Sequence, residues 1–164
     1  MSAPDFPTVY EFETRIETAI VNALFAENVI AKASRDNNVI DATELPFVAV
    51  QLAVGGTTGH YAPNVQSYDR PDRWNGVVSL TVRTNRTVEQ STPQHQSTLS
   101  IIRSVMYAIP HTLTSAELPY HEIHTVDETG TVVQVIENAD HDVSVISFAI
   151  TFGIRPDAWP EAGD

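Results

Sequence analysis

The feature that most constrains the fold is a strict alternation of large and small side chains near the end of the sequence. Residues 143–154 read VSVISFAITFGI, and the large side chains at every second position are Ile146, Phe148, Ile150, Phe152 and Ile154. Because the side chains of a strand alternate between its two faces, this spacing predicts a β-strand with one buried face. Such a face needs a second layer to cover it, and the chain must supply that layer.

Two stretches have instead the three- and four-residue spacing of amphipathic helices. Thr8 and Glu11 form a capping box at the start of the first. In the second, Thr92 is the predicted N-cap, Pro93 the first helical residue, and Pro110 is expected to end the helix. The apolar stripes consist of Phe12, Ile16, Ala19, Ile20, Ala23 and Leu24 in the first helix and of Leu99, Ile102, Val105, Met106 and Ile109 in the second.

The remaining periodic stretches predict strands. They lie at about 29–33, 46–54, 74–84, 120–126, 131–137 and 143–154, with turns at 127–130 and 138–140. The 46–54 stretch is apolar on both faces and predicts an inner strand. The order α-β-β-(β)-α-β-β-β predicts an α+β fold, with a mainly antiparallel β-sheet and the two amphipathic helices packed on one face. We expect one domain over 1–164, with a long loop at 55–73 and an extended C-terminal tail at 155–164.

The chain is strongly acidic, with a formal net charge of −12 at pH 7 over 164 residues. This charge disfavours tight binding of nucleic acid, which depends on neutralising phosphates, but it suits a wall past which DNA slides. The absence of cysteine excludes disulfides, thiolate nucleophiles and cysteine-based zinc sites. The N-terminus lacks the features of a signal peptide, and no apolar stretch reaches the roughly 20 residues that span a bilayer. We therefore expect a soluble protein made in a cytoplasm.

No arrangement of side chains in the sequence predicts catalysis. His121 and His124 are three residues apart on a predicted strand, so they point to opposite faces. Residues 140–142 (Asp-His-Asp) lie at a predicted hairpin tip, where metal binding is the alternative to a solvated turn. Residues 55–59 (GGTTG) lack the lysine of a phosphate-binding loop, and no helix follows them. We predict no enzyme activity, no cofactor and no metal.

The segment Gly55–Arg73 is the first candidate for a contact with another protein. A loop of this length without periodicity in a compact domain is usually functional or disordered. Its tyrosines and arginines are types enriched at interface centres. The candidate interface residues in and beside it are Tyr61, Tyr68, Arg70, Arg73 and Trp74. The alternative is a solvated hairpin tip.

The second candidate contact follows the last strand, where Trp159 stands between Pro156 and Pro160. The prolines stiffen the tail and reduce the entropy that is lost when Trp159 docks. An indole left in water would forgo a large burial term, so we expect Trp159 to lie in a groove. The groove belongs either to its own subunit or to a neighbour, and Arg155 is expected to pair with a nearby acidic group.

This order of elements resembles the tail terminator and tail-completion (neck) proteins of long-tailed bacteriophages. The resemblance runs from Tyr10 to Pro156 and consists of an amphipathic first helix, a strand pair with a long loop (Phe47–Thr84), a second helix (Pro93–Ile109) and a closing strand set. It implies a virion structural protein that forms a ring, commonly hexameric, at the head-proximal end of the tail. There it would terminate the tail tube and join it to the head connector.

The resemblance also implies the partners. They are further copies of the chain, the tail tube protein and a head-connector or adaptor protein, with genomic DNA only passing through the lumen and no membrane. It implies a location in the tail or neck of the virion after synthesis in the host cytoplasm. One surface would then face a central channel and carry a negative field, whereas the alternative is that the acidic residues only provide solubility.

Two other functions remain open on the sequence. A close variant is another neck component or the tail-tube protein itself. A different class is a small-molecule-binding or enzymatic α+β domain, which requires a deep pocket lined by convergent polar groups.

Overall fold

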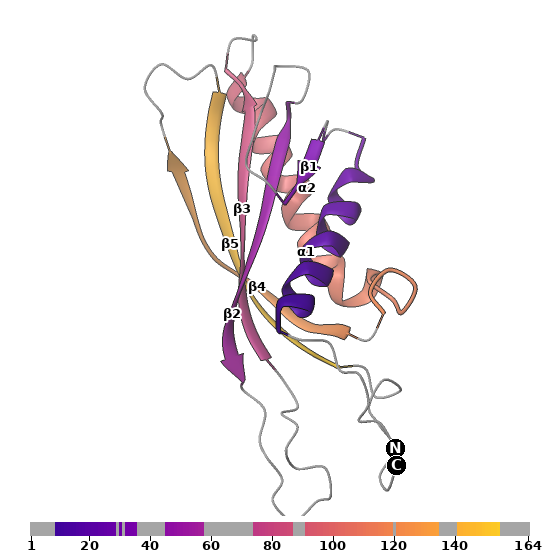
Figure 1. Cartoon of the computed structure of the whole chain (residues 1–164). Coiled ribbons are helices and arrows are strands. Elements are labelled where there is room, and N and C mark those ends of the chain that lie inside the picture. The colour runs from indigo at the N-terminus through magenta and orange to yellow at the C-terminus, as the bar shows by residue number, and fades with distance from the viewer. Residues whose placement is uncertain are drawn as a thin grey trace, which may run out of the picture.

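The protein consists of one twisted five-stranded sheet with two helices on the same side (Figure 1). The structure is a computed structural model that describes residues 9–28, 30, 32–35, 45–57, 74–86, 91–119, 121–134 and 141–154. The elements are α1 (Val9–Phe25), β1 (Lys32–Ser34), β2 (Phe47–Thr57), β3 (Trp74–Asn85), α2 (Ser91–Thr112), β4 (His121–Gln134) and β5 (His141–Ile154). The predicted α+β class, with a mainly antiparallel sheet and both helices on one face, is confirmed.

The strand order is β1-β2-β3-β5-β4. All neighbouring pairs are antiparallel except β1 and β2, which run parallel over the three residues of β1. β2 therefore lies between two strands, as its apolar character on both faces predicts. β5, the strand with the strictest alternation, lies between β3 and β4. It pairs with β3 from His141 to Phe152.

The core lies between the sheet and the helices. Ile16, Ile20 and Leu24 of α1 and Ile102, Met106 and Ile109 of α2 are fully buried against the sheet. On the sheet side, the buried residues occupy alternate positions of three adjacent strands: Val48, Val50, Leu52, Val78, Leu80, Val82, Ile146, Phe148, Ile150 and Phe152. The prediction that the large side chains of 146–152 share one buried face is therefore confirmed, and that face is covered by both helices.

The predicted turn at 127–130 is wrong. β4 continues through these residues, so the stretches predicted as separate strands at 120–126 and 131–137 are one strand as far as Gln134. The register instead shifts twice, between Ile123 and Thr125 and between Glu128 and Gly130. A β-bulge accommodates one extra residue without ending the strand, and turn-forming residue types suit it. The Asp-Glu-Thr-Gly sequence signals this bulge rather than a reversal of the chain.

The boundaries of the second helix also differ from the prediction. α2 begins at Ser91, so Thr92 lies inside it rather than at the N-cap, and Pro93 lies in the first turn, where a missing N–H costs nothing. Pro110 does not end the helix, which continues to Thr112. A proline removes the N–H that would bond to the residue four positions earlier, so the helix loses support and ends within a turn. The predicted capping box lies outside the described residues because Thr8 does.

Candidate interaction surfaces

The face of the sheet opposite the helices is exposed over much of its area. We give the name open sheet face to three rows of this surface, which consist of Gln51, Ala53, Asn75, Val77, Ser79, Ser147, Ala149, Thr151, Thr125 and Asp127. On the same side of the sheet, Arg83 lies beyond one end of these rows and Glu122 beyond the other. The register places these residues in rows across four strands, such as Ala53, Val77, Ala149 and Asp127. In Figure 1 both helices lie on the other side of the sheet.

The open sheet face carries little charge. Its side chains are small or hydroxylated, Asp127 is the one charged member of the set, and Val77 is 43% exposed. Thr125 and Thr151 form a cross-strand hydrogen bond of 2.6 Å. A shallow hollow of about 210 Å³ lies above Gly76 and Ala149. A surface with so little charge on a protein of net charge −12 suits contact with another protein surface.

A polar network joins α2 to the bulge of β4. Arg103 donates two hydrogen bonds to the Glu128 carboxylate, Nε to Oε2 at 2.9 Å and Nη2 to Oε1 at 3.0 Å. The Thr131 hydroxyl donates to the same Oε1 at 2.8 Å, and the Tyr107 hydroxyl oxygen accepts from the backbone N–H of Glu128 at 3.0 Å. The hydrogen bond from Arg103, with that from Thr131, holds the pKa of Glu128 below its usual value. The bulge thus aims a carboxylate at α2.

A buried histidine joins the start of α2 to two strands. His95 Nδ1 and Thr84 Oγ1 of β3 are 2.7 Å apart, and His95 Nε2 and Ser144 Oγ of β5 are also 2.7 Å apart. Burial lowers the pKa of His95, and the charge of Asp142 opposes this shift. A serine beside a histidine is the pattern of a nucleophile and its base. Here Ser144 is fully buried, so a substrate cannot reach its hydroxyl, and the cluster is structural.

A buried carboxylate covers one edge of the sheet. β1 pairs only with Phe47, Val48 and Ala49, so the edge of β2 beyond these residues has no strand beside it among the described residues. Glu17 of α1, 8% exposed, accepts a hydrogen bond from the backbone N–H of Leu52 at 3.4 Å. Its other oxygen accepts from Arg35 at 3.2 Å. One N–H of the edge is thereby satisfied by a charged side chain instead of a strand.

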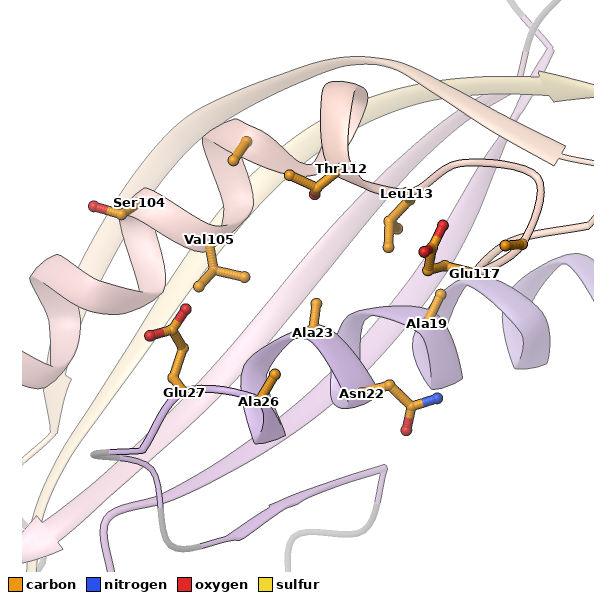
Figure 2. A pocket seen from close by; sticks show the side chains of 12 residues that line it. Ala19, Asn22, Ala23, Ala26, Glu27, Ser104, Val105, Thr112, Leu113 and Glu117 are labelled. Carbon is orange, nitrogen blue, oxygen red and sulfur yellow. The ribbon is translucent and has the colours of Figure 1, made fainter.

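A groove of about 590 Å³ separates the C-terminal parts of the two helices. Figure 2 shows the side chains of Ala23 in α1 and of Ala26, just after α1, pointing across it toward Val105 of α2. The residues that line it are mostly small, so the groove has an apolar floor that a third segment can approach closely. Glu27 and Glu117 lie at its two ends, and none of the described residues that line it is basic.

Of the predicted interface residues, the structure describes only Trp74. It is half-buried at the start of β3, packs against the core and stacks on Phe152, with ring centroids 6.2 Å apart. The other candidates, Tyr61, Tyr68, Arg70, Arg73, Arg155 and Trp159, lie outside the described residues. Their roles at an interface remain predictions.

The described residues also bear on the predicted absence of a metal site and of a membrane span. Within the described part of the chain, no three histidine or acidic side chains gather as a metal site would require. Of the predicted Asp-His-Asp tip, the carboxylate of Asp142 accepts a hydrogen bond from Arg86 at 3.0 Å. No helix among the described ranges is long and apolar enough to cross a membrane.

Comparisons with known proteins identify the fold. No family model matches the chain. No curated protein matches it either. Among solved structures, the chain is similar to one from the virion of a native gene transfer agent particle. That match has a TM-score of 0.62 and 9% sequence identity, and it covers 90% of this chain and 99% of the other. At this identity the likeness concerns the fold, and it extends over nearly the whole of both chains.

Proposed function

We propose that this protein is a virion structural protein that forms a ring of six copies at the head-proximal end of a phage tail. In this position it terminates the tail tube and joins it to the head connector, and genomic DNA passes through its lumen without being bound. The observation that carries the proposal is the likeness in fold to a chain of a gene transfer agent virion, over 90% of this chain and 99% of that one.

The open sheet face supports the proposal because it offers a surface for a neighbouring subunit or the tail tube. Asp127 is the one charged residue in its three rows, and charged groups are depleted at the core of an interface. The first three residues of the predicted 55–73 loop belong to β2, which ends at Thr57. Residues 58–73, with Tyr61, Tyr68, Arg70 and Arg73, join β2 to β3 and supply the second contact of this proposal. Two different surfaces that meet make a heterologous contact, and repetition of such a contact closes into a ring when the rotation permits.

The distribution of charge supports a lumen that repels DNA. Twelve of the 21 acidic residues, but only three of the nine basic ones, lie in segments outside the described residues. The elements of the fold are therefore much less acidic than the chain as a whole. We propose that acidic segments line the channel, where repulsion of phosphate lets DNA slide.

Imaging of the purified protein, together with light scattering, tests the proposal. We expect single closed rings whose mass is a multiple of the 18.0 kDa subunit. Long tubes would identify a tail-tube component instead, and discrete monomers at high concentration would contradict a self-assembling ring. A ring structure with a basic lumen would contradict the proposed path of DNA.

A charge placed on the open sheet face tests its role in the ring. Ala149→Arg puts a long cation in the middle of this face, and we expect it to disperse the rings while the subunit keeps its thermal stability. Gln96→Lys, an exposed position on α2 away from this face, is the matched control and should leave the rings intact. Rings that survive Ala149→Arg would exclude this face from the assembly.

A further inference from the structure

We propose that Trp159, in the segment that follows β5, docks in the groove between α1 and α2 of its own subunit. The inference does not depend on the ring and concerns how the helical layer is completed.

The position of the end of β5 is the first argument. Ile154 pairs with His121 at the start of β4, and Glu117, at one end of the groove, is four residues before His121. Glu117 itself lies in a compact turn, in which the Leu118 N–H is bonded to the Thr114 carbonyl at 2.9 Å. In Figure 1 the end of β5 and the start of β4 lie at the end of the molecule where α2 leaves for β4. The chain therefore leaves β5 beside the Glu117 end of the groove.

The reach of the segment is the second argument. Trp159 is five positions after Ile154, and an extended chain of that length spans about 17 Å. The groove runs along α1 from Ala19 to Glu27, a rise of about 12 Å. Trp159 can therefore reach the half of the groove that Ala19 and Ala116 line.

The chemistry of the groove is the third argument. The small side chains of Ala19, Ala23 and Ala116 leave an apolar space that an indole fills. Arg155, the one basic residue of 155–164, enters at the acidic end beside Glu117. The acidic residues of the segment lie before and after the apolar stretch Ala158, Trp159 and Pro160. Only this apolar stretch needs to enter the groove, so the acidic residues can stay away from its acidic ends.

Fluorescence of a single tryptophan tests the docking. The chain has two tryptophans, so Trp74→Phe leaves Trp159 as the sole reporter. We expect its emission at a shorter wavelength than that of free indole and a several-fold weaker quenching by acrylamide. Adding Ala23→Glu, which places a charge in the groove, should restore the emission and quenching of a free indole. Gln96→Glu, on α2 outside the groove, is the control and should change neither. Free-indole emission in Trp74→Phe itself would overturn the proposal.

An engineered disulfide separates docking on the same subunit from docking on a neighbour, and it keeps Trp74. The chain has no cysteine, so Ala158→Cys with Ala116→Cys gives one defined pair. We expect an oxidised monomer that migrates faster without reductant, at all protein concentrations. Ala158→Cys with Gln96→Cys is the control and should not form this species. Covalent dimers and larger ladders, or no bond at all, would overturn the assignment to the same subunit.

Discussion

His95 attaches the start of α2 to the sheet through two hydroxyl groups on neighbouring strands. The imidazole is 7% exposed, and Thr84 and Ser144 are fully buried. Loss of the imidazole would leave both hydroxyl groups without this partner in a place that water does not reach, at a cost of about 1–3 kcal/mol. A single polar side chain thus fixes where the helix begins to pack.

The lowered pKa of His95 predicts a loss of stability in mild acid. As the pH falls below 6.5, the ordinary value of the group, the unfolded chain takes up a proton that the folded chain does not yet bind. The free energy of unfolding therefore decreases as the pH falls from 6.5 to the lower pKa of the folded state. The stabilisation that the neutral His95 provides is present in full only above pH 6.5. His95→Gln should lower stability at pH 7.5 and remove this part of the pH dependence in urea unfolding.

His111→Gln is the control for this experiment because His111 is exposed at the end of α2. It should leave the free energy of unfolding at pH 7.5 unchanged. An identical slope for the parent and for His95→Gln would refute the assignment.

The sequence does not single out His95, because a histidine among polar residues at the start of a helix reads as a solvated side chain. Its role depends on Thr84 and Ser144, which are distant in sequence and meet only in the folded sheet. The burial of Phe152, in contrast, is predictable from the spacing of its own neighbours. Periodicity thus identifies what is buried, and a polar partner is identified only by the tertiary structure.

At the scale of elements, β4 shows how one local signal has two structural outcomes. Asp-Glu-Thr-Gly suits either a turn or a bulge, and the choice depends on whether a partner strand runs alongside. β5 continues to run alongside β4 beyond these four residues, where Gly130 pairs with Ser147 and Thr131 pairs with Ile146. Elements with strong periodicity were therefore predictable, and the interruption within β4 was not.

The contact between α2 and the bulge predicts a measurable coupling. In a double-mutant cycle of Arg103→Ala and Glu128→Gln, we expect a coupling of about 0.2–1 kcal/mol, because both side chains are partly exposed. The coupling should fall as salt is added. Since hydrogen bonding by Arg103 lowers the pKa of Glu128 below its ordinary 4.5, the coupling should persist through pH 4.5 and disappear only in stronger acid.

Arg103→Ala with Asp127→Ala is the matched control for the cycle. Asp127 is next to Glu128 in sequence but belongs to the open sheet face, so this pair should show no coupling. Equal coupling in the two cycles would mean that Arg103 interacts with the overall negative charge of β4 and not specifically with Glu128.

At the scale of the whole molecule, the sequence predicts how the layers stack but not which surface is left open. The alternation in β2 and β3 shows small residues opposite the core, and that pattern is equally consistent with solvent or a partner. The groove between the helices arises from small residues on two elements far apart in the chain, so no local pattern reports it. Surfaces that depend on such combinations require the tertiary structure.

Removal of residues 58–73 tests their proposed role in assembly. Thr57 pairs directly with Trp74, so a two-residue Asn-Gly turn can join β2 to β3 without changing the register. We expect the shortened chain to keep its thermal stability and to lose ring formation. A full-length variant with Tyr61→Ser and Tyr68→Ser should weaken assembly in the same direction. If the shortened chain still forms rings, the segment is a solvated tip.

The two bulges of β4 protect the subunit from aggregation through its sheet edge. An edge strand with regular hydrogen-bonding groups is a template for aggregation, and bulges spoil that template. β4 is an edge strand interrupted at two places, and at the opposite edge Glu17 places a carboxylate against β2. The sheet can therefore expose a wide neutral face while its edges resist growth into fibrils. Subunits built this way can therefore reach high concentration without pairing edge to edge, and they associate through the face that fits a neighbour.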